Sequence, residues 1–468
     1  MKKRVKTREF EMLEKGPKQG NLLETPILEF ADRNHALIIL AGKIDWASLE
    51  EVFAEVYSWK MGAPAKSVRL MVGLHFLKYM HNFSDESIIE HWVENPYWQY
   101  FCGEEYFQKK FPIHPTTMTK WRNRLKGRHL DKLLEETIAT GLTLKVLTKR
   151  SFEHVNVDTT VMEKNVSFPT DGKLLYKSIQ HINSFARDHG LKLKQTFERV
   201  GKERLLMIQR YAHSRKMKKS RRELRKLKTN LNQLIRMVTK QVKGKAAKSF
   251  AVIKETAERL LGQTRTTKNK IYSLHEPHVE CISKGKAHKR YEFGCKVGFV
   301  TTSKEGFVLS AKAFHGNPYD GHTLNENLSH AEKIVEGKGA IKEAFADRGY
   351  RGHGYAGETK VHIVKNIGKQ KQPLKKWMKR RSVVEADIGF MKRENRLGCN
   401  YLKGITGDQT NAAFAAIGKN MRILLREISF LFFLPEILPA IHLFFTAGTI
   451  FKTIFPKKQC FFLKISLP

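Results

Sequence analysis

The N-terminal part of the chain is patterned as a series of short helices. In residues 46–57, apolar side chains recur every three or four positions after Asp45, a residue type that caps helix starts. Residues 1–35 are mixed in character and are expected to be extended. The predicted helices cover 46–57, 64–83 with Pro64 in the first turn, 85–95, and 114–138, which Lys126-Gly127 divides into two.

The last of these helices is basic on one side. Its first part carries Lys120, Arg122 and Arg124. Short helices that end in a basic helix resemble a helix-turn-helix module, which places a helix in the major groove of DNA. A plain helical bundle with a solvated basic face is the alternative. We therefore expect these three side chains to contact DNA.

The hydrophobic period changes from helical to alternating after residue 150. Residues 152–161 read as a strand that ends at Asp158. Residues 289–314 contain two strands joined by the turn Ser303–Gly306, which is a hairpin signal. A helix over 322–335, a strand over 339–350 that ends at Asp347, a strand over 361–366 and a final helix follow. This order predicts a mixed α/β sheet.

A long helical segment, about residues 175–285, interrupts the predicted sheet. It contains an apolar seam at three- and four-residue intervals, typical of a short coiled coil or helical hairpin, formed by Leu224, Leu227, Leu231, Leu234 and Val238. The other faces are rich in Lys and Arg, including Arg221, Arg222 and Arg225. Residues 199–248 hold 18 Lys and Arg against two acids, a net charge of +16. So much charge of one sign favours a polyanion as partner.

Composition supports a nucleic-acid partner for the whole chain. The 468 residues include 85 Lys and Arg against 46 Asp and Glu, a formal charge of +39. DNA or RNA is the first expectation and an anionic membrane surface the second. Hydrophobic residues make up 41% of the chain, which excludes a basic disordered tail. The predicted domains are a helical N-terminal domain (1–145), an α/β domain (150–427, with the insertion) and a hydrophobic tail (428–468).

Cysteine spacing and the two termini bear on the compartment. The five cysteines are scattered, which argues against a disulfide framework and a zinc site and for a reducing, cytoplasmic setting. The N-terminus does not resemble a signal peptide. Residues 428–451 are long and apolar, but Pro435, Glu436 and Pro439 interrupt them, so a membrane span is disfavoured. Core packing, an oligomer contact and translation past the end of a degraded gene remain alternatives.

Three acids stand at positions suited to metal chemistry. Asp158 and Asp347 lie at predicted strand ends, and Glu385 lies on a helix-like run, residues 381–396, between Arg381 and Lys392 at offsets of four and seven. Three carboxylates can hold two Mg²⁺ ions through oxygen, and such a site activates water or a sugar hydroxyl at a phosphodiester. Unrelated strand-end acids beside an ordinary amphipathic helix are the alternative.

These motifs together resemble the DDE transposases of bacterial insertion sequences, most closely the insertion-sequence-five group. Its signature is Tyr, two residues, Arg, three residues, Glu, six residues and Lys. Arg381, Glu385 and Lys392 match that spacing, whereas Met378 replaces the Tyr. The resemblance also rests on VDTTV with PTDGKLL, on ADRGYRG and on HKRYEFGCK, and it covers about residues 35–427.

The resemblance implies a fold, a mechanism and partners. The catalytic domain would be ribonuclease-H-like, and Asp158, Asp347 and Glu385 would bind two Mg²⁺ ions, with Mn²⁺ expected to substitute. Hydrolysis would free a 3′-hydroxyl at each transposon end for attack on target DNA. The N-terminal helices and the insertion would grip double-stranded DNA at the terminal inverted repeats, in a homodimer associated with the nucleoid. A ribonuclease-H-like nuclease without strand transfer and an inactive DNA-binding relic are the rival functions.

Several further side chains near these motifs carry weaker expectations. Asp387 and Glu394 are expected to be solvated charges, because they point away from Glu385 around the helix. His315 is assigned to a loop. Tyr350 and Lys365 are possible DNA contacts.

Overall fold

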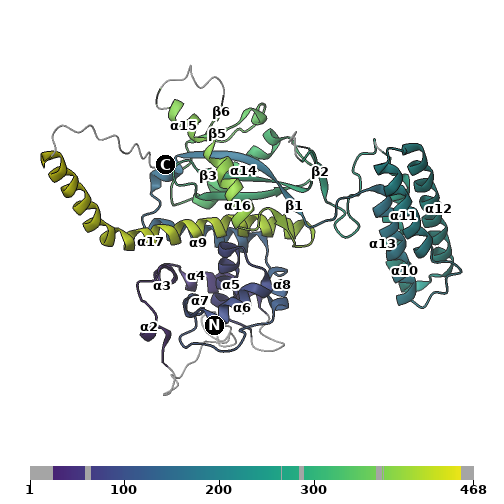
Figure 1. Cartoon of the computed structure of the whole chain (residues 1–468), viewed down its shortest axis with the longest axis horizontal. Helices are drawn as coiled ribbons and strands as arrows, with labels where there is room; N and C mark the ends of the chain where they lie inside the picture. Colours follow the sequence, from purple (N-terminus) through teal and green to yellow (C-terminus); the bar gives the residue numbers. More distant parts are fainter. Residues whose placement is uncertain are drawn as a thin grey trace, which may run out of the picture. The chain divides into compact units, whose positions relative to one another are not determined.

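The computed structural model describes residues 25–57, 65–264, 266–283, 289–364, 372 and 374–454, with side chains to residue 430 in the last range. The chain divides into two compact units. One comprises Met1–Arg124, Glu136–Leu147 and Asn420–Pro468, and the other comprises Leu125–Glu135 and Thr148–Lys419. The helices α9 (Gly127–Thr143) and α17 (Gly404–Ile454) contribute residues to both (Figure 1).

The first unit is helical throughout its described elements. α4 begins where the sequence predicts, because the Asp45 carboxylate accepts a hydrogen bond from the Ser48 amide at 3.0 Å. α5 begins after a Ser67 cap, whereas Pro64 lies outside the described residues. Extended structure was expected for residues 1–35, but a short helix, α2, occupies part of that range, and residues 1–24 lie outside the described part. The elements are α2 (Ile27–Phe30), α3 (Ala36–Ala41), α4 (Trp46–Phe53), η1 (Ala54–Val56), α5 (Val68–His81), α6 (Asp85–Glu94), α7 (Pro96–Phe101) and α8 (Pro115–Arg122).

The second unit is built on a mixed sheet, as the alternating pattern predicts. The strand order is β2-β3-β1-β5-β6, with β4 paired to β3 and β7 paired to β1. β3 runs antiparallel to β1 and β4, whereas β5 runs parallel to β1, and β6 runs parallel to β5. The strands are β1 (His154–Lys164), β2 (Glu280–Ile282), β3 (Glu292–Thr302), β4 (Val308–Phe314), β5 (Glu343–Ala346), β6 (Lys360–Ile363) and β7 (Cys399–Asn400).

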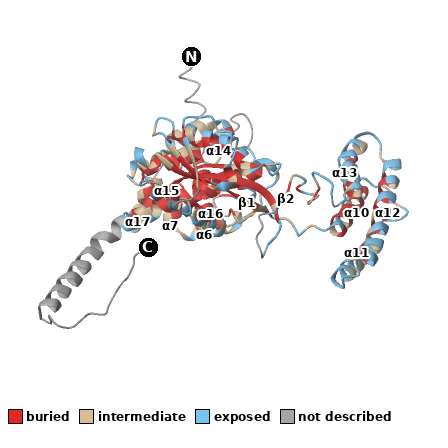
Figure 2. Ribbon diagram, turned by 90° about the horizontal axis from the view of Figure 1, so that it is seen from above, coloured by how far each residue is buried: buried red, intermediate tan, exposed pale blue. Residues whose placement is uncertain are grey.

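Helices cover this sheet and connect its strands. The connecting helices are η2 (Lys149–Phe152), α14 (Asp320–Val335), η3 (Arg348–Tyr350), α15 (Leu374–Arg380) and α16 (Val383–Glu394). Figure 2 shows the strands as the most continuously buried part of the unit. The predicted hairpin turn between β3 and β4 is confirmed, and Gly306 adopts a φ of +69° there, which suits glycine.

The expected end of the first strand at Asp158 is wrong. β1 continues to Lys164, and Asp158 lies in its middle, opposite Phe299 of β3. The continuation has a physical reason: Thr159, Thr160 and Val161 are β-branched, and their pairing with β3 is unbroken.

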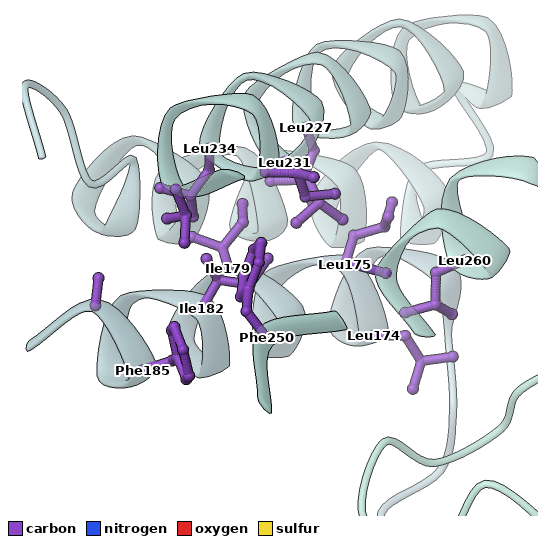
Figure 3. Close-up of a cluster of buried hydrophobic side chains, with 14 of the residues drawn as sticks. Leu174, Leu175, Ile179, Ile182, Phe185, Leu227, Leu231, Leu234, Phe250 and Leu260 are labelled. Carbon is purple, nitrogen blue, oxygen red and sulfur yellow. The ribbon is translucent and has the colours of Figure 1, made fainter. Parts of the chain in front are cut away.

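The helical insertion forms a separate bundle of α10 (Asp171–Asp188), α11 (Glu198–His213), α12 (Met217–Gln241) and α13 (Gly244–Gly262). The predicted seam on α12 lies in the core of the bundle, where Leu227, Leu231 and Leu234 are buried (Figure 3). Val238 is also buried there, and Leu224 packs against the cluster. They meet apolar side chains of α10 and α13, such as Ile179 and Phe250. The seam was therefore read correctly as a helix–helix interface.

The hydrophobic tail is only partly described. α17 continues to Ile454, and the side chains beyond residue 430 and the backbone beyond 454 lie outside the described residues. No helix in the described part of the chain is long and apolar enough to cross a membrane.

Candidate active site

Asp158 and Asp347 are brought together by two neighbouring strands. β1 and β5 pair in parallel, with Asn156 opposite Phe345. Continuing that register by two residues places Asp158 beside Asp347, about 5 Å away across the ladder. Asp347 follows the last residue of β5, as predicted, and its Oδ1 accepts a hydrogen bond from the Gly349 amide at 2.8 Å.

Arg381 joins both aspartates to Glu385. Its Nη2 lies 2.9 Å from Asp158 Oδ2 and 3.7 Å from Asp347 Oδ2. Its Nη1 lies 2.8 Å from Glu385 Oε1. One guanidinium therefore contacts all three acids that the sequence singles out, although Asp158 and Arg381 are 223 residues apart.

The turn between α15 and α16 positions that guanidinium. The predicted single run over 381–396 is wrong in this respect, because α15 ends at Arg380 and α16 begins at Val383, so Arg381 lies in the turn. Arg380 ties the turn to the β3–β4 hairpin: its Nε donates to the Ser303 carbonyl at 3.0 Å and its Nη2 to the Lys304 carbonyl at 3.2 Å. The break leaves the Arg381–Glu385 contact intact.

The three carboxylates differ in their access to solvent. The Asp158 side chain is 14% exposed, that of Asp347 42% and that of Glu385 62%. A set of carboxylate oxygens, open on one side and gathered around a cationic group, matches the oxygen ligands that Mg²⁺ takes. The donor types therefore suit a hard divalent cation, although among the described residues these acids do not bring three ligand atoms within 4.8 Å of one another. Lys392 lies two turns beyond Glu385 on α16 and is half-buried.

A fourth acid, Asp320, lies at the same place and was missed in the sequence. Its Oδ1 accepts a hydrogen bond from the Thr159 hydroxyl at 2.7 Å and lies 2.9 Å from the Nζ of the buried Lys296. A Cβ added at Gly349 would lie 2.9 Å from Asp347 Oδ1 and 3.2 Å from Asp320 Oδ2. The one signal in the sequence is an acid at the start of α14, which is common at any helix start.

The aspartates affect the pKa of Tyr350. Tyr350 is fully buried, and burial raises the pKa of its phenol well above the usual range, with Asp158, Asp320 and Asp347 adding to the effect. The phenol therefore stays protonated. The sequence suggested Tyr350 as a DNA contact. Its side chain is buried, so the structure does not expose it to DNA.

The predicted DNA-binding side chains fall into two groups. Arg122 is buried, and its guanidinium makes paired contacts to Asp85, at 2.7 Å from Nη1 and 2.5 Å from Nη2. It is thus a structural ion pair and not a phosphate contact, which corrects the expectation. The side chains that stay exposed are Lys120, Arg124, Arg221, Arg222 and Arg225.

Other expectations near the site are resolved case by case. Asp387 is not a solvated charge: it lies 2.7 Å from Lys419 Nζ, and burial raises its pKa, while the Lys419 ammonium lowers it. Met378, at the Tyr position of the signature, is buried in the core. Its neighbour Trp377 stacks on His154 with ring centroids 4.2 Å apart. Lys365 lies outside the described residues.

Comparisons with known proteins identify two domains. Residues 26–124 match the family described as Transposase domain (DUF772), and residues 263–416 match the family described as Transposase DDE domain. The second match includes Asp347, Arg381 and Glu385, whereas Asp158 lies outside it.

One curated relative is similar to part of the chain. The chain is 46% identical over 180 residues to an uncharacterized protein, ORF8 in the nfe locus of Rhizobium meliloti, and the match covers 38% of this chain and 86% of that protein. No solved structure gives a significant match. Two transposase domain families therefore match this chain, and the second of them is a DDE domain.

Proposed function

We propose that this chain is the transposase of an insertion sequence of the insertion-sequence-five type, with Asp158, Asp347 and Glu385 as its metal-binding catalytic acids. The observation that carries the proposal is the contact of one guanidinium, that of Arg381, with all three carboxylates. Unrelated surface acids would have no reason to converge on one half-buried guanidinium from three separate segments of the chain.

The sheet supports a ribonuclease-H-like catalytic domain. Its antiparallel strands β4, β3 and β1 are followed by β5 and β6, which run parallel to β1. In this arrangement the first acid lies on the central strand, the second follows the neighbouring parallel strand, and the third lies on a helix that packs against β1. This placement lets three carboxylates from distant parts of a chain meet at one place on the sheet.

The acids would hold two Mg²⁺ ions, which activate the attacking oxygen and stabilise the leaving oxygen of a phosphodiester. Mn²⁺ would substitute, because it takes the same oxygen ligands. The chain's own contribution is to fix these ligands. The backbone amide of Thr159 donates a hydrogen bond to Asp158 Oδ1 at 2.7 Å, and that of Gly349 donates one to Asp347 Oδ1. Both carboxylates are therefore held in position before any ligand binds.

Arg381 would exchange partners when DNA binds. Its guanidinium, now shared among three carboxylates, can bind a phosphate in the forked geometry that arginine favours. Lys392, further along α16, would contact the same backbone. The two bases thus place the phosphodiester beside the acids.

DNA would be gripped by exposed basic side chains outside the site. Lys120 and Arg124 of the α8 region, with the Arg-rich outer face of α12, would bind the terminal inverted repeats through their phosphates. A homodimer would pair two such ends on nucleoid DNA in the cytoplasm.

The test is a joining assay with the full chain, Mg²⁺, DNA carrying the element's ends and a supercoiled target. We expect nicks with free 3′-hydroxyls and covalently joined target DNA. Nicks without joined product would favour a nuclease without strand transfer. Neither product, with DNA binding retained, would favour an inactive relic.

A further inference from the structure

A second group of metal-ligand side chains lies away from the three acids. Among the residues that the structure describes, Cys295, His315 and Asp408 alone bring three possible ligand atoms within 4.8 Å of one another. His315 Nε2 lies 3.7 Å from Asp408 Oδ2, and His278 Nε2 lies 3.5 Å from the same oxygen. Ligands around a tetrahedral zinc ion lie about 3.3–3.7 Å apart, given bonds of about 2.0–2.3 Å.

Several polar atoms of this group are buried without a hydrogen bond. Both ring nitrogens of His315 and one carboxylate oxygen of Glu280 have none in the described structure, and His278 Nε2 has none either, although it lies 3.1 Å from Glu276 Oε2. Buried polar atoms are nearly always satisfied, so a cluster of exceptions points to a missing partner. Asp408 is itself 2% exposed, and Cys295 is 1% exposed.

The charged groups around the cluster favour an additional cation. Lys164 Nζ lies 2.7 Å from Asp408 Oδ1 and 3.3 Å from Glu276 Oε2. One ammonium therefore contacts two carboxylates, those of Asp408 and Glu276. Lys164 contacts the Oδ1 oxygen, whereas the two imidazoles face Oδ2, so the second oxygen is available to another positive group.

We propose that Cys295, His315 and Asp408 form a structural zinc site, with His278 in reach of the fourth position. One thiolate, imidazole and one carboxylate form a donor set of the kind that selects Zn²⁺ over Mg²⁺. The proposal departs from the expectation drawn from cysteine spacing, because the ligands come from four separate segments: His278 before β2, Cys295 on β3, His315 after β4 and Asp408 in α17.

The site is distinct from the catalytic acids and does not rest on the proposed function. Cys295 pairs with Met162 on β1, and Asp158 pairs with Phe299, four residues further along β3. The two places are therefore about 13 Å apart along the strands. A metal here would tie the edge of the β2–β3–β4 sheet to the start of α17, which fits a stabilising role.

The test uses Co²⁺ as a spectroscopic substitute for zinc in the full-length chain after removal of bound metal. We expect one equivalent of Co²⁺ to give thiolate-to-cobalt charge transfer and tetrahedral d–d absorption, both displaced by Zn²⁺. C295A should abolish the charge transfer, and H315A should weaken Co²⁺ binding by roughly 100-fold, since even outer contacts of a metal site cost 10–100-fold.

Two controls separate this site from the rest of the chain. C281A removes a half-buried cysteine on β2, and E385Q alters the catalytic acids, so both should keep the charge-transfer band. Absence of the band from the unmutated chain would overturn the proposal, as would an unchanged band in C295A. If C295A fails to fold, H315Q, which keeps Cys295, replaces it as the test. A full-strength charge-transfer band with wild-type Co²⁺ affinity in H315Q would overturn the proposed site.

Discussion

The guanidinium of Arg381 lies 2.9 Å from Asp158, and the same nitrogen lies 3.7 Å from Asp347. The acids belong to adjacent parallel strands, and the arginine belongs to a turn that is fixed to the β3–β4 hairpin by its neighbour Arg380. The contact places Arg381 and Glu385, the Arg and Glu of the signature, beside the two aspartates. Arg381 is the side chain that contacts all three acids.

Replacing Arg381 with Ala should lower the nicking rate by about 100-fold, a typical cost of removing one charge-stabilising donor from an active site. R381K should recover little, because an ammonium cannot fork between carboxylates or hold a phosphate through two parallel bonds. Single-turnover nicking at saturating Mg²⁺ measures both. R393A, which removes an exposed arginine of α16, is the matched control, and equal rates for R381A and R393A would refute the role.

A methyl group at residue 349 should impair the site without unfolding the protein. The added Cβ of G349A meets the Asp347 and Asp320 carboxylates at 2.9 and 3.2 Å, so it must displace one of them. A displacement of about 1 Å costs up to about 100-fold in rate. The added Cβ of G389A, at an exposed position of α16, meets nothing within 4 Å, so this change should add up to about 1 kcal/mol of stability with unchanged nicking. Wild-type activity in G349A would show that nicking does not depend on the positions of the Asp347 and Asp320 carboxylates.

The Asp85–Arg122 pair should control the acid stability of the helical unit. Burial alone would raise the pKa of Asp85, but Arg122 and Lys78 outweigh it and hold that pKa well below its usual range. The folded carboxylate therefore has the lower pKa, so its stabilisation is complete above the unfolded value of about 4 and is lost as pH falls below it.

Denaturant unfolding of D85A at pH 7 checks this. Leaving Arg122 buried without its partner should cost about 3–5 kcal/mol. The difference between D85A and the unmutated chain should shrink at pH 3. A cost below about 1 kcal/mol at pH 7 would mean that the pair is not structural and that Arg122 is free to bind DNA after all.

The outer face of α12 should contribute phosphate contacts. Changing Arg221, Arg222 and Arg225 together to Ala should weaken binding to DNA and reduce the slope of log affinity against log salt by about 2–3, since each neutralised phosphate contributes about 0.9. Asn232 and Gln233 on the same helix are exposed and uncharged, and their replacement by Ala should leave the slope unchanged. An unaltered slope in the arginine variant would remove the bundle from the DNA interface.

The parts of the fold that depend on local pattern were predictable. The β3–β4 hairpin, the α12 seam and the position of Asp347 after its strand each follow from spacing within a few residues. The strand around Asp158 was not read to its end, because an acid followed by two threonines looks like a turn, and only the β3 ladder shows that it continues.

The parts that depend on distant partners were not predictable. Arg122 appears exposed by its helical position, and its burial depends on Asp85, 37 residues away. Asp320 is a second case, because only the fold brings it into contact with Thr159 and Lys296. Cys295 is a third, because its neighbours come from three other segments. A single sequence carries no signal for such pairings, since they are created by the sheet.

The most direct test of the account compares Mg²⁺-dependent nicking of end-bearing DNA by D158N, D347N and E385Q with nicking by E394Q, whose altered acid lies on the same helix as Glu385. The account predicts that each of the first three loses activity by at least about 1,000-fold while DNA binding is kept, as for groups that act as one catalytic unit. E394Q should nick at the wild-type rate. Wild-type nicking by any one of the three acid variants would contradict the assignment of that carboxylate and, with it, the three-acid site.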